Sequence, residues 1–75
     1  MHDTYSMLHR SAILEDPVMS ARALAHYLRR IRVTSSISVL NSLAREIVER
    51  FPQDEATPRL TEIISQKVRR LVRLN

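Results

Sequence analysis

Glycine is absent from this 75-residue chain, and so are cysteine and tryptophan. Phosphate-binding loops, dinucleotide-binding turns and strained nucleophile turns need glycine where the backbone approaches a ligand closely or adopts a positive φ, so the sequence has no local signature of those sites. Tight β-hairpins also favour glycine in their turns. Without cysteine the chain has neither disulfide bonds nor thiolate metal ligands. These absences favour a helical chain whose segments are separated by proline.

Aromatic side chains and long hydrophobic runs are also scarce. The chain has two tyrosines and one phenylalanine, and none is interleaved with the basic runs, so a stacking platform for single-stranded nucleic acid is not predicted. No apolar run approaches the roughly 20 residues that span a bilayer, and the N-terminal residues lack the basic start and apolar core of a signal peptide. We therefore expect a soluble, cytoplasmic protein without a membrane partner.

The length predicts one small domain, residues 1–75. A chain of this size buries only about 60–65% of its unfolded surface, so its margin of stability is thin. Disulfide bonds and thiolate metal sites, which support many small domains, are excluded by the lack of cysteine. Association with a partner, or with a second copy of the chain, is the remaining route to further burial.

Hydrophobic periodicity places the centre of the fold between Thr34 and Phe51. One helical face of this stretch is apolar, and the other carries serine, asparagine and alternating charges, among which Glu46 and Arg50 are spaced to pair. One of the residues 34–36 is expected to cap the helix. The predicted buried stripe comprises Ile37, Leu40, Ala44, Ile47 and Phe51, widened by Leu43 and Val48.

Three further helices are predicted around the central one. A short helix runs from Tyr5 to about Leu14, and a second starts at the Asp16–Pro17 pair and ends near Ile31. After the polar loop PQDEATP, Thr57 and Pro58 begin a last helix that ends near Leu74. The expected fold is therefore all-α, a small bundle of three main helices plus a short N-terminal helix. The apolar residues that we expect these helices to bury are Tyr5, Leu8 and Ala12, then Ala21, Leu24, Leu28 and Ile31, then Leu60, Ile63, Ile64, Val68, Leu71 and Val72.

Candidate catalytic and metal-binding groups are sparse. His2, His9 and His26 do not have the i, i+4 spacing that places two imidazoles on one helix face. Glu46 and Glu49 each have an arginine one turn away, which is typical of a solvated charged face rather than an acid–base pair in a cleft. We predict no enzyme, no cofactor and no metal site.

Positive charge is concentrated near the ends of two helices. Residues 58–75 contain five basic and one acidic residue, a net charge of +4, whereas residues 34–57 contain two basic and four acidic residues, a net charge of −2. Such runs suit helix C-termini and solubility, and they also suit phosphate or acidic protein. The candidate basic patch consists of Arg29, Arg30, Arg32, Lys67, Arg69, Arg70 and Arg73.

The order LAHYL, a turn and VTSSISVLNSL superficially resembles a helix-turn-helix motif. The turn lacks glycine, and the second helix carries Glu46 and Glu49, which phosphate groups would repel. A small nucleic-acid-binding regulator of this kind is therefore the alternative interpretation.

The chain has more apolar residues outside its predicted buried helical faces than so small a core can cover. Such a surplus is typical of an interface. The favoured hypothesis is a non-enzymatic regulatory or adaptor protein that binds another protein through its helical surfaces, with a homodimer as the simplest case. The candidate apolar interface consists of Met7, Met19, Val33, Val39 and Leu74.

Overall fold

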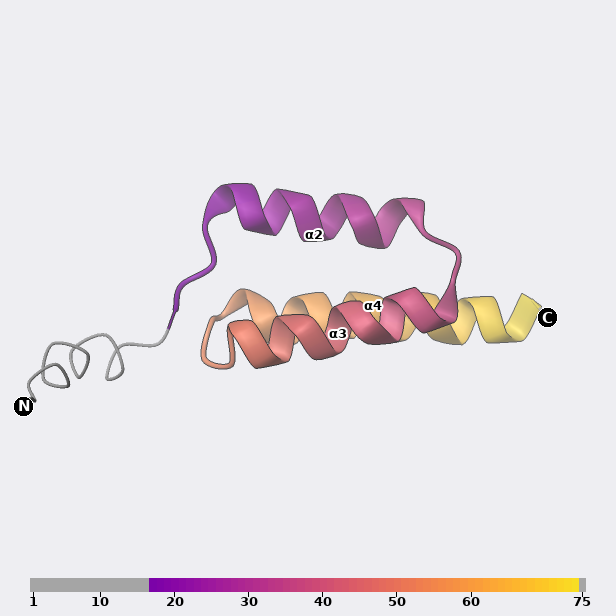
Figure 1. Cartoon of the computed structure of the whole chain (residues 1–75). Helices are drawn as coiled ribbons and strands as arrows, with labels where there is room; N and C mark the ends of the chain where they lie inside the picture. Colours follow the sequence, from indigo (N-terminus) through magenta and orange to yellow (C-terminus); the bar gives the residue numbers. More distant parts are fainter. Residues whose placement is uncertain (1–16, 75) are drawn as a thin grey trace, which may run out of the picture.

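The computed structural model describes residues 17–74, and all the regular structure in that range is helical. Helix α2 spans Ala21–Val33, α3 spans Ile37–Arg50 and α4 spans Ala56–Leu74. Short turns join them, so α3 runs antiparallel to both neighbours while α2 and α4 run in the same direction (Figure 1). The all-helical bundle of three main helices is confirmed. The short helix predicted from Tyr5 to Leu14 lies outside the described residues.

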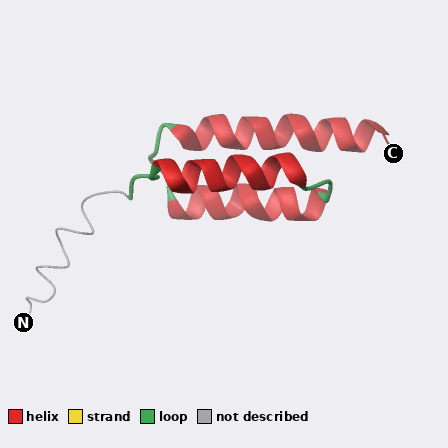
Figure 2. Ribbon diagram, turned by 90° about the horizontal axis from the view of Figure 1, so that it is seen from above, coloured by secondary structure: helices red, strands yellow, loops and turns green. Residues whose placement is uncertain are grey.

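Helix α3 supplies more buried core residues than either of its neighbours, as its periodicity predicts. Leu40 and Ile47 are fully buried and Leu43 is nearly so, whereas Val48, which was expected to widen the stripe, is 47% exposed. Only two helices flank α3 in the described range, so a third side of it remains in solvent (Figure 2). The buried apolar core consists of Tyr27, Ile31, Leu40, Leu43, Ile47, Phe51, Leu60 and Ile64.

The start of α2 differs from the prediction. The helix does not begin at Pro17 but at Ala21, because the Ser20 side chain accepts a hydrogen bond from the Ala23 N–H at 3.1 Å and caps the first turn. Residues 17–20 have no regular secondary structure. Within them the Met19 N–H donates to Asp54 Oδ2 at 2.7 Å, which fixes the segment beside the α3–α4 turn. The cap of α3 is Ser36, whose side chain accepts from the Val39 N–H.

The buried face of α2 is also turned from the predicted one. Ala21 is exposed and Leu28 is 41% exposed, while Tyr27 and Ile31 are buried at 2% and 3%. Turning Tyr27 rather than Leu28 inward buries the larger side chain and places its ring against another aromatic ring in the core. The ring meets Phe51 edge to face, with centroids 6.4 Å apart.

The last helix starts earlier than the Thr57–Pro58 pair predicts. It begins at Ala56, whose N–H donates to Asp54 Oδ1 at 2.7 Å. Thr57 therefore lies in the first turn, where it is buried and its hydroxyl donates to the Phe51 carbonyl. The residues between Phe51 and Ala56 form the polar loop. Asp54 connects this loop to the segment that precedes α2 and to the first residue of α4.

The Asp54 carboxylate should make the fold less stable as the pH becomes acidic. Hydrogen bonds from the Met19 and Ala56 N–H groups hold the pKa of this carboxyl below its ordinary value. A depressed folded-state pKa adds stability that is fully present above the unfolded value of about 3.9 and is lost as the pH falls through the folded value. We expect Asp54→Asn to lower the melting temperature at pH 7 and to flatten its decline between about pH 5 and pH 2. Thermal denaturation followed by circular dichroism, with Glu55→Gln as the exposed neighbouring control, measures this. An unchanged pH profile in Asp54→Asn would contradict it.

Candidate functional site

Most basic side chains gather at the end of the bundle where α2 finishes. Helix α4 continues past the turn between α2 and α3, as both Figure 1 and Figure 2 show. Lys67 of α4 joins this projection to α2, because its Nζ donates to the carbonyl oxygen of Ile31 at 2.6 Å and to that of Arg32 at 3.0 Å. Tertiary packing thus brings the two predicted basic runs to one end of the molecule.

We call seven residues at this end of the molecule the basic end. The Lys67 ammonium satisfies carbonyls at the C-terminus of α2, where the helix dipole favours a cation, so its role is structural. Arg69 lies 3.9 Å from Glu62, and both side chains are more than 60% exposed, so this pair contributes little to stability. Arg32, Lys67 and Arg70 line one shallow depression. The basic end consists of Arg29, Arg30, Arg32, Lys67, Arg69, Arg70 and Arg73.

Acidic residues are sparse near the basic end, where Glu62 lies 3.9 Å from Arg69. None occurs in residues 17–45 or 63–74, so most charges at this end of the three helices are positive. Four of the five acidic residues in the described range lie around the α3–α4 turn at the opposite end. The bundle is therefore electrically polarised along its length. Those four residues are Glu46, Glu49, Asp54 and Glu55.

Apolar side chains are exposed among these arginines. Val33 at the end of α2 is 71% exposed, and on the projecting part of α4 Val72 is 58% and Leu74 is 76% exposed. Val72 was expected in the buried band of α4, and that expectation is wrong, because the adjacent Leu71 packs against the core while Val72 lies near the end of α4 on a side that no described helix covers. The basic end is thus a mixed surface of arginine and valine or leucine.

The five residues of the predicted apolar interface lie in different environments. Val33 and Leu74 are exposed beside the basic end. Met19 and Val39 are partly buried and pack against the core. Met7 lies outside the described residues.

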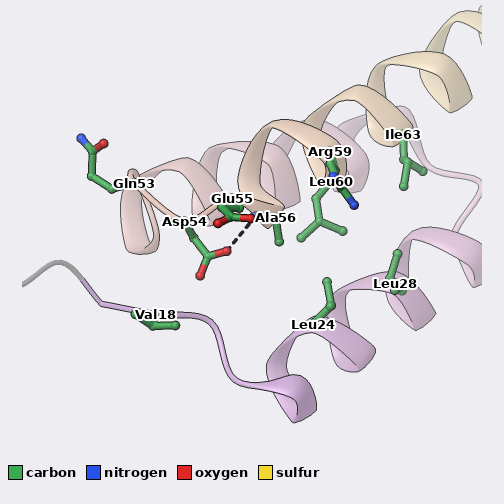
Figure 3. A pocket seen from close by; sticks show the side chains of 10 residues that line it. All are labelled: Val18, Leu24, Leu28, Gln53, Asp54, Glu55, Ala56, Arg59, Leu60 and Ile63. Carbon is green, nitrogen blue, oxygen red and sulfur yellow. Dashed lines mark hydrogen bonds between the residues drawn. The ribbon is translucent and has the colours of Figure 1, made fainter.

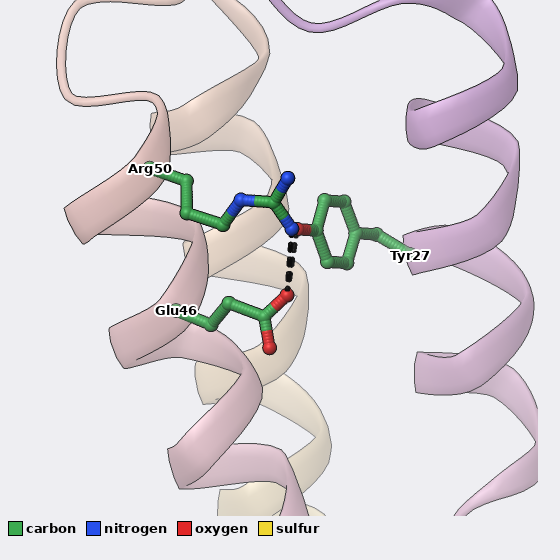
Figure 4. A network of polar contacts seen from close by, with 3 residues as sticks. All are labelled: Tyr27, Glu46 and Arg50. Atoms are coloured by element: carbon green, nitrogen blue, oxygen red, sulfur yellow. Dashed lines mark hydrogen bonds and ion pairs between the residues drawn. The ribbon is translucent and has the colours of Figure 1, made fainter.

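A polar cluster joins α2 to α3. The Tyr27 hydroxyl donates to Glu46 Oε2 at 2.9 Å (Figure 4). Arg50 Nη1 lies 3.4 Å from the Tyr27 hydroxyl oxygen and 3.4 Å from Glu46 Oε2. Burial, followed by the hydrogen bond to the Glu46 carboxylate, raises the pKa of Tyr27. The predicted Glu46–Arg50 pair is confirmed, but Glu46 is also the acceptor that orients Tyr27 rather than a purely solvated side chain. Arg50 further lies over the Phe51 ring, 5.5 Å from its centroid.

Sequence reasoning missed Tyr27. The stripe through Leu24 and Leu28 and the stripe through Ala23 and Tyr27 share Ile31, so helical spacing alone cannot choose between them. The available signal was Glu46, a carboxylate on the neighbouring helix that the hydroxyl can reach only if the ring faces inward. Pairing of this kind becomes visible once the helices are placed.

An apolar groove runs between α2 and α4 on the side away from the polar cluster. Figure 3 shows Leu24 and Leu28 of α2 facing Leu60 and Ile63 of α4, with charged residues of the α3–α4 turn at one end. Leu28 and Ile63 are each 41% exposed, although both were expected to be buried. The groove has a volume of about 650 Å³. We call it the α2/α4 groove, lined chiefly by Val18, Leu24, Leu28, Arg59, Leu60 and Ile63.

Residues 17–74 offer no cluster of three or more histidine, aspartate or glutamate side chains that could hold a metal ion. His26 is exposed on α2 beside Tyr27, whereas His2 and His9 lie outside the described range. None of the helices in this range is long and apolar enough to cross a membrane.

The helix-turn-helix resemblance is not reflected in the packing. Helices of that motif cross at about 90–120°, whereas α2 and α3 lie side by side and antiparallel (Figure 1). Comparison of the chain with protein-family models, with curated proteins and with solved structures gives no match.

Proposed function

We propose that this chain is a small, non-enzymatic regulatory or adaptor protein that binds another protein through its basic end. The observation that carries the proposal is the projecting part of α4, where Val72 and Leu74 are exposed among Arg69, Arg70 and Arg73. Exposed apolar side chains surrounded by polar ones mark interaction sites on soluble proteins, and arginine is enriched at interfaces. The cytoplasm is the compartment that we propose for this activity.

A protein suits this surface better than a nucleic acid does. Arginines alone would fit a phosphate backbone, but Val33, Val72 and Leu74 would gain nothing from lying against phosphate groups. A protein partner can cover the apolar side chains and pair with the arginine rim at once. Nucleic-acid binding remains the second candidate, because Lys67 brings both basic runs to the same end.

The partner surface should be acidic. Two copies of the chain joined through their basic ends would oppose arginine with arginine, which disfavours a symmetric homodimer at this site. An acidic protein surface with a central apolar patch complements the charge and the exposed valine and leucine side chains. The expected association is therefore fast at low salt and slower as salt screens the charges.

The test is affinity capture of the full chain's partner from its source cells, with and without nuclease, followed by binding measurements with the identified protein. Val72→Asp combined with Leu74→Asp should weaken binding about tenfold or more, since apolar contacts at an interface centre typically contribute 1–2 kcal/mol each. The triple variant Arg69→Glu, Arg70→Glu, Arg73→Glu should weaken it further and remove the salt dependence.

Val48→Asp is the matched control, because Val48 is a half-exposed valine on α3, away from the basic end. It should bind as the unmodified chain does. Circular dichroism of each variant checks that the helices are retained. Equal binding by the Val72/Leu74 variant and the control would contradict the proposal. Loss of all captured material on nuclease treatment would favour the nucleic-acid candidate instead.

For the fold, we propose that residues 5–14 form the short helix that their apolar spacing predicts, so that residues 1–75 make one domain. This helix would be separate from α2, because Pro17 disfavours helical geometry in the residue before it. Support comes from the sequence pattern, in which Tyr5, Leu8 and Ala12 recur at helical intervals.

A further inference from the structure

The α2/α4 groove is apolar surface that the three described helices leave uncovered. Leu28 and Ile63 form its rim at 41% exposure each, and Val18 at its entrance is 79% exposed. The space of about 650 Å³ is large enough to take several side chains. Val72 and Leu74 do not line it, so the proposed partner does not account for it.

The chain enters the described fold at one end of this groove. Val18 itself lines the groove, and the neighbouring Met19 N–H is fixed to Asp54 Oδ2 at 2.7 Å. Residues 1–16 are therefore tethered within a few residues of the groove's entrance. A tether of this length gives an effective concentration in the millimolar range, so weak apolar contacts are enough for occupancy.

Residues 5–14 are long enough to span the groove. A ten-residue helix is about 15 Å long, and α4 rises about 10 Å from Ala56 to Ile63, the two α4 residues that bound the groove. A helix leading back from the entrance would run antiparallel to α4. With equal rise per residue, Ala12 then falls about level with Arg59, and Leu8 about level with Ile63.

The charges of the two parts are complementary. Residues 1–16 contain one basic and three acidic residues, a net charge of −2, while residues 17–75 contain eleven basic and five acidic residues, a net charge of +6. In the antiparallel register Asp3 comes about level with Lys67 and Arg70, which line the continuation of the groove beyond Ile63. At the entrance Glu15 and Asp16 begin near Arg59, but the acidic Asp54 and Glu55 line the same end, so the charge complementarity rests on the far end of the groove.

We propose that residues 1–16 of the same chain occupy the α2/α4 groove, with Leu8 packed between Leu28 and Ile63, and so complete a four-helix bundle. The groove is then filled from within, and the exposed Val33, Val72 and Leu74 remain open to other proteins. This inference goes beyond the proposed function and does not depend on it.

The absence of cysteine makes disulfide trapping in the full chain a clean test. Two variants pair the segment with the groove, Leu8→Cys with Ile63→Cys and Ala12→Cys with Arg59→Cys. The matched control is Leu8→Cys with Val48→Cys, because Val48 is as exposed as Ile63 but lies on α3, away from the groove. Under mild oxidation at low protein concentration, we expect an intramolecular disulfide in at least one groove pair about tenfold faster than in the control.

A second measurement avoids cysteine altogether. In the full chain, Leu8→Asp should shift the methyl resonances of Leu28 and Ile63, while Ser6→Asp, on the opposite side of the predicted helix, should leave them unchanged. Equal trapping rates in groove and control pairs, together with unshifted methyl resonances, would overturn the proposal. A disulfide-linked dimer as the main product of the groove pairs would also overturn it, because it would make a second copy the occupant. Neither result bears on binding at Val72 and Leu74, so the two proposals fail separately.

Discussion

Replacing Ile47 with aspartate is expected to unfold the protein. Ile47 is fully buried at the centre of α3, and residues 17–74 place no cationic side chain in the core beside it. The change removes an apolar contact that costs about 2–5 kcal/mol when lost and adds the larger penalty of burying an unpaired charge. A domain of this size has a total stability of only about 4–11 kcal/mol, so most of the population should be unfolded at 25 °C.

Circular dichroism and urea denaturation measure this effect. Ser42→Asp is the matched control, because it places the same carboxylate on an exposed position of the same helix. It should change the unfolding free energy by no more than about 0.5 kcal/mol. A cooperative unfolding transition of normal midpoint in Ile47→Asp would show that α3 is not the centre of the core.

Replacing Tyr27 with alanine should have the next largest effect. The ring is 2% exposed, packs edge to face against Phe51 and is the largest side chain that α2 contributes to the core. Its loss leaves a cavity between α2 and α3 and should cost about 3–5 kcal/mol. Since 1 kcal/mol shifts the melting temperature of such a domain by about 4–8 °C, the melting temperature should fall by at least 12 °C.

Tyr27→Phe separates packing from the hydroxyl. This variant keeps the ring but loses the hydrogen bond to Glu46, whose carboxylate is still partly solvated, so we expect a cost of about 0.5–1.5 kcal/mol. Because the pKa of Tyr27 is raised in the fold, its contribution is fully present below about pH 10 and is lost as the pH rises through the folded value. Tyr27→Phe should lack that alkaline loss. Equal destabilisation by Tyr27→Phe and Tyr27→Ala would mean that the hydroxyl, rather than the ring, holds α2 in place.

The central helix is the element that sequence predicts best. Between residues 36 and 51, every helical face that the apolar spacing allows includes Leu40 and Ile47. Ser36 supplies the N-terminal cap. Helix α2 is harder, because its apolar residues permit two rotations that differ only in whether Tyr27 or Leu28 faces the core. The partner helix decides between them, by offering Phe51 to the ring and Glu46 to the hydroxyl.

The candidate site shows the same division. The basic character of residues 29–32 and 67–73 is evident in the sequence, but their meeting at one end depends on Lys67 reaching the carbonyls of Ile31 and Arg32. The exposure of Val72 depends on its lying on a side of α4 that no described helix covers, and the exposure of Leu28 and Ile63 depends on where α2 and α4 part. Periodicity marks all three residues as apolar without saying which of them a neighbour will cover.

The sequence by itself determined that residues 17–74 are mainly helical, where the three main helices lie to within a few residues, and that one face of α3 is buried. Local rules suffice for these properties, because capping, proline geometry and the 3.6-residue period act over one or two turns. Only the tertiary structure decided the rotation of α2, the start of α4 at Ala56, the shared basic end and the open groove. Those features arise from contacts between residues far apart in the chain, and their free energies depend on distances that exist only once the helices are packed.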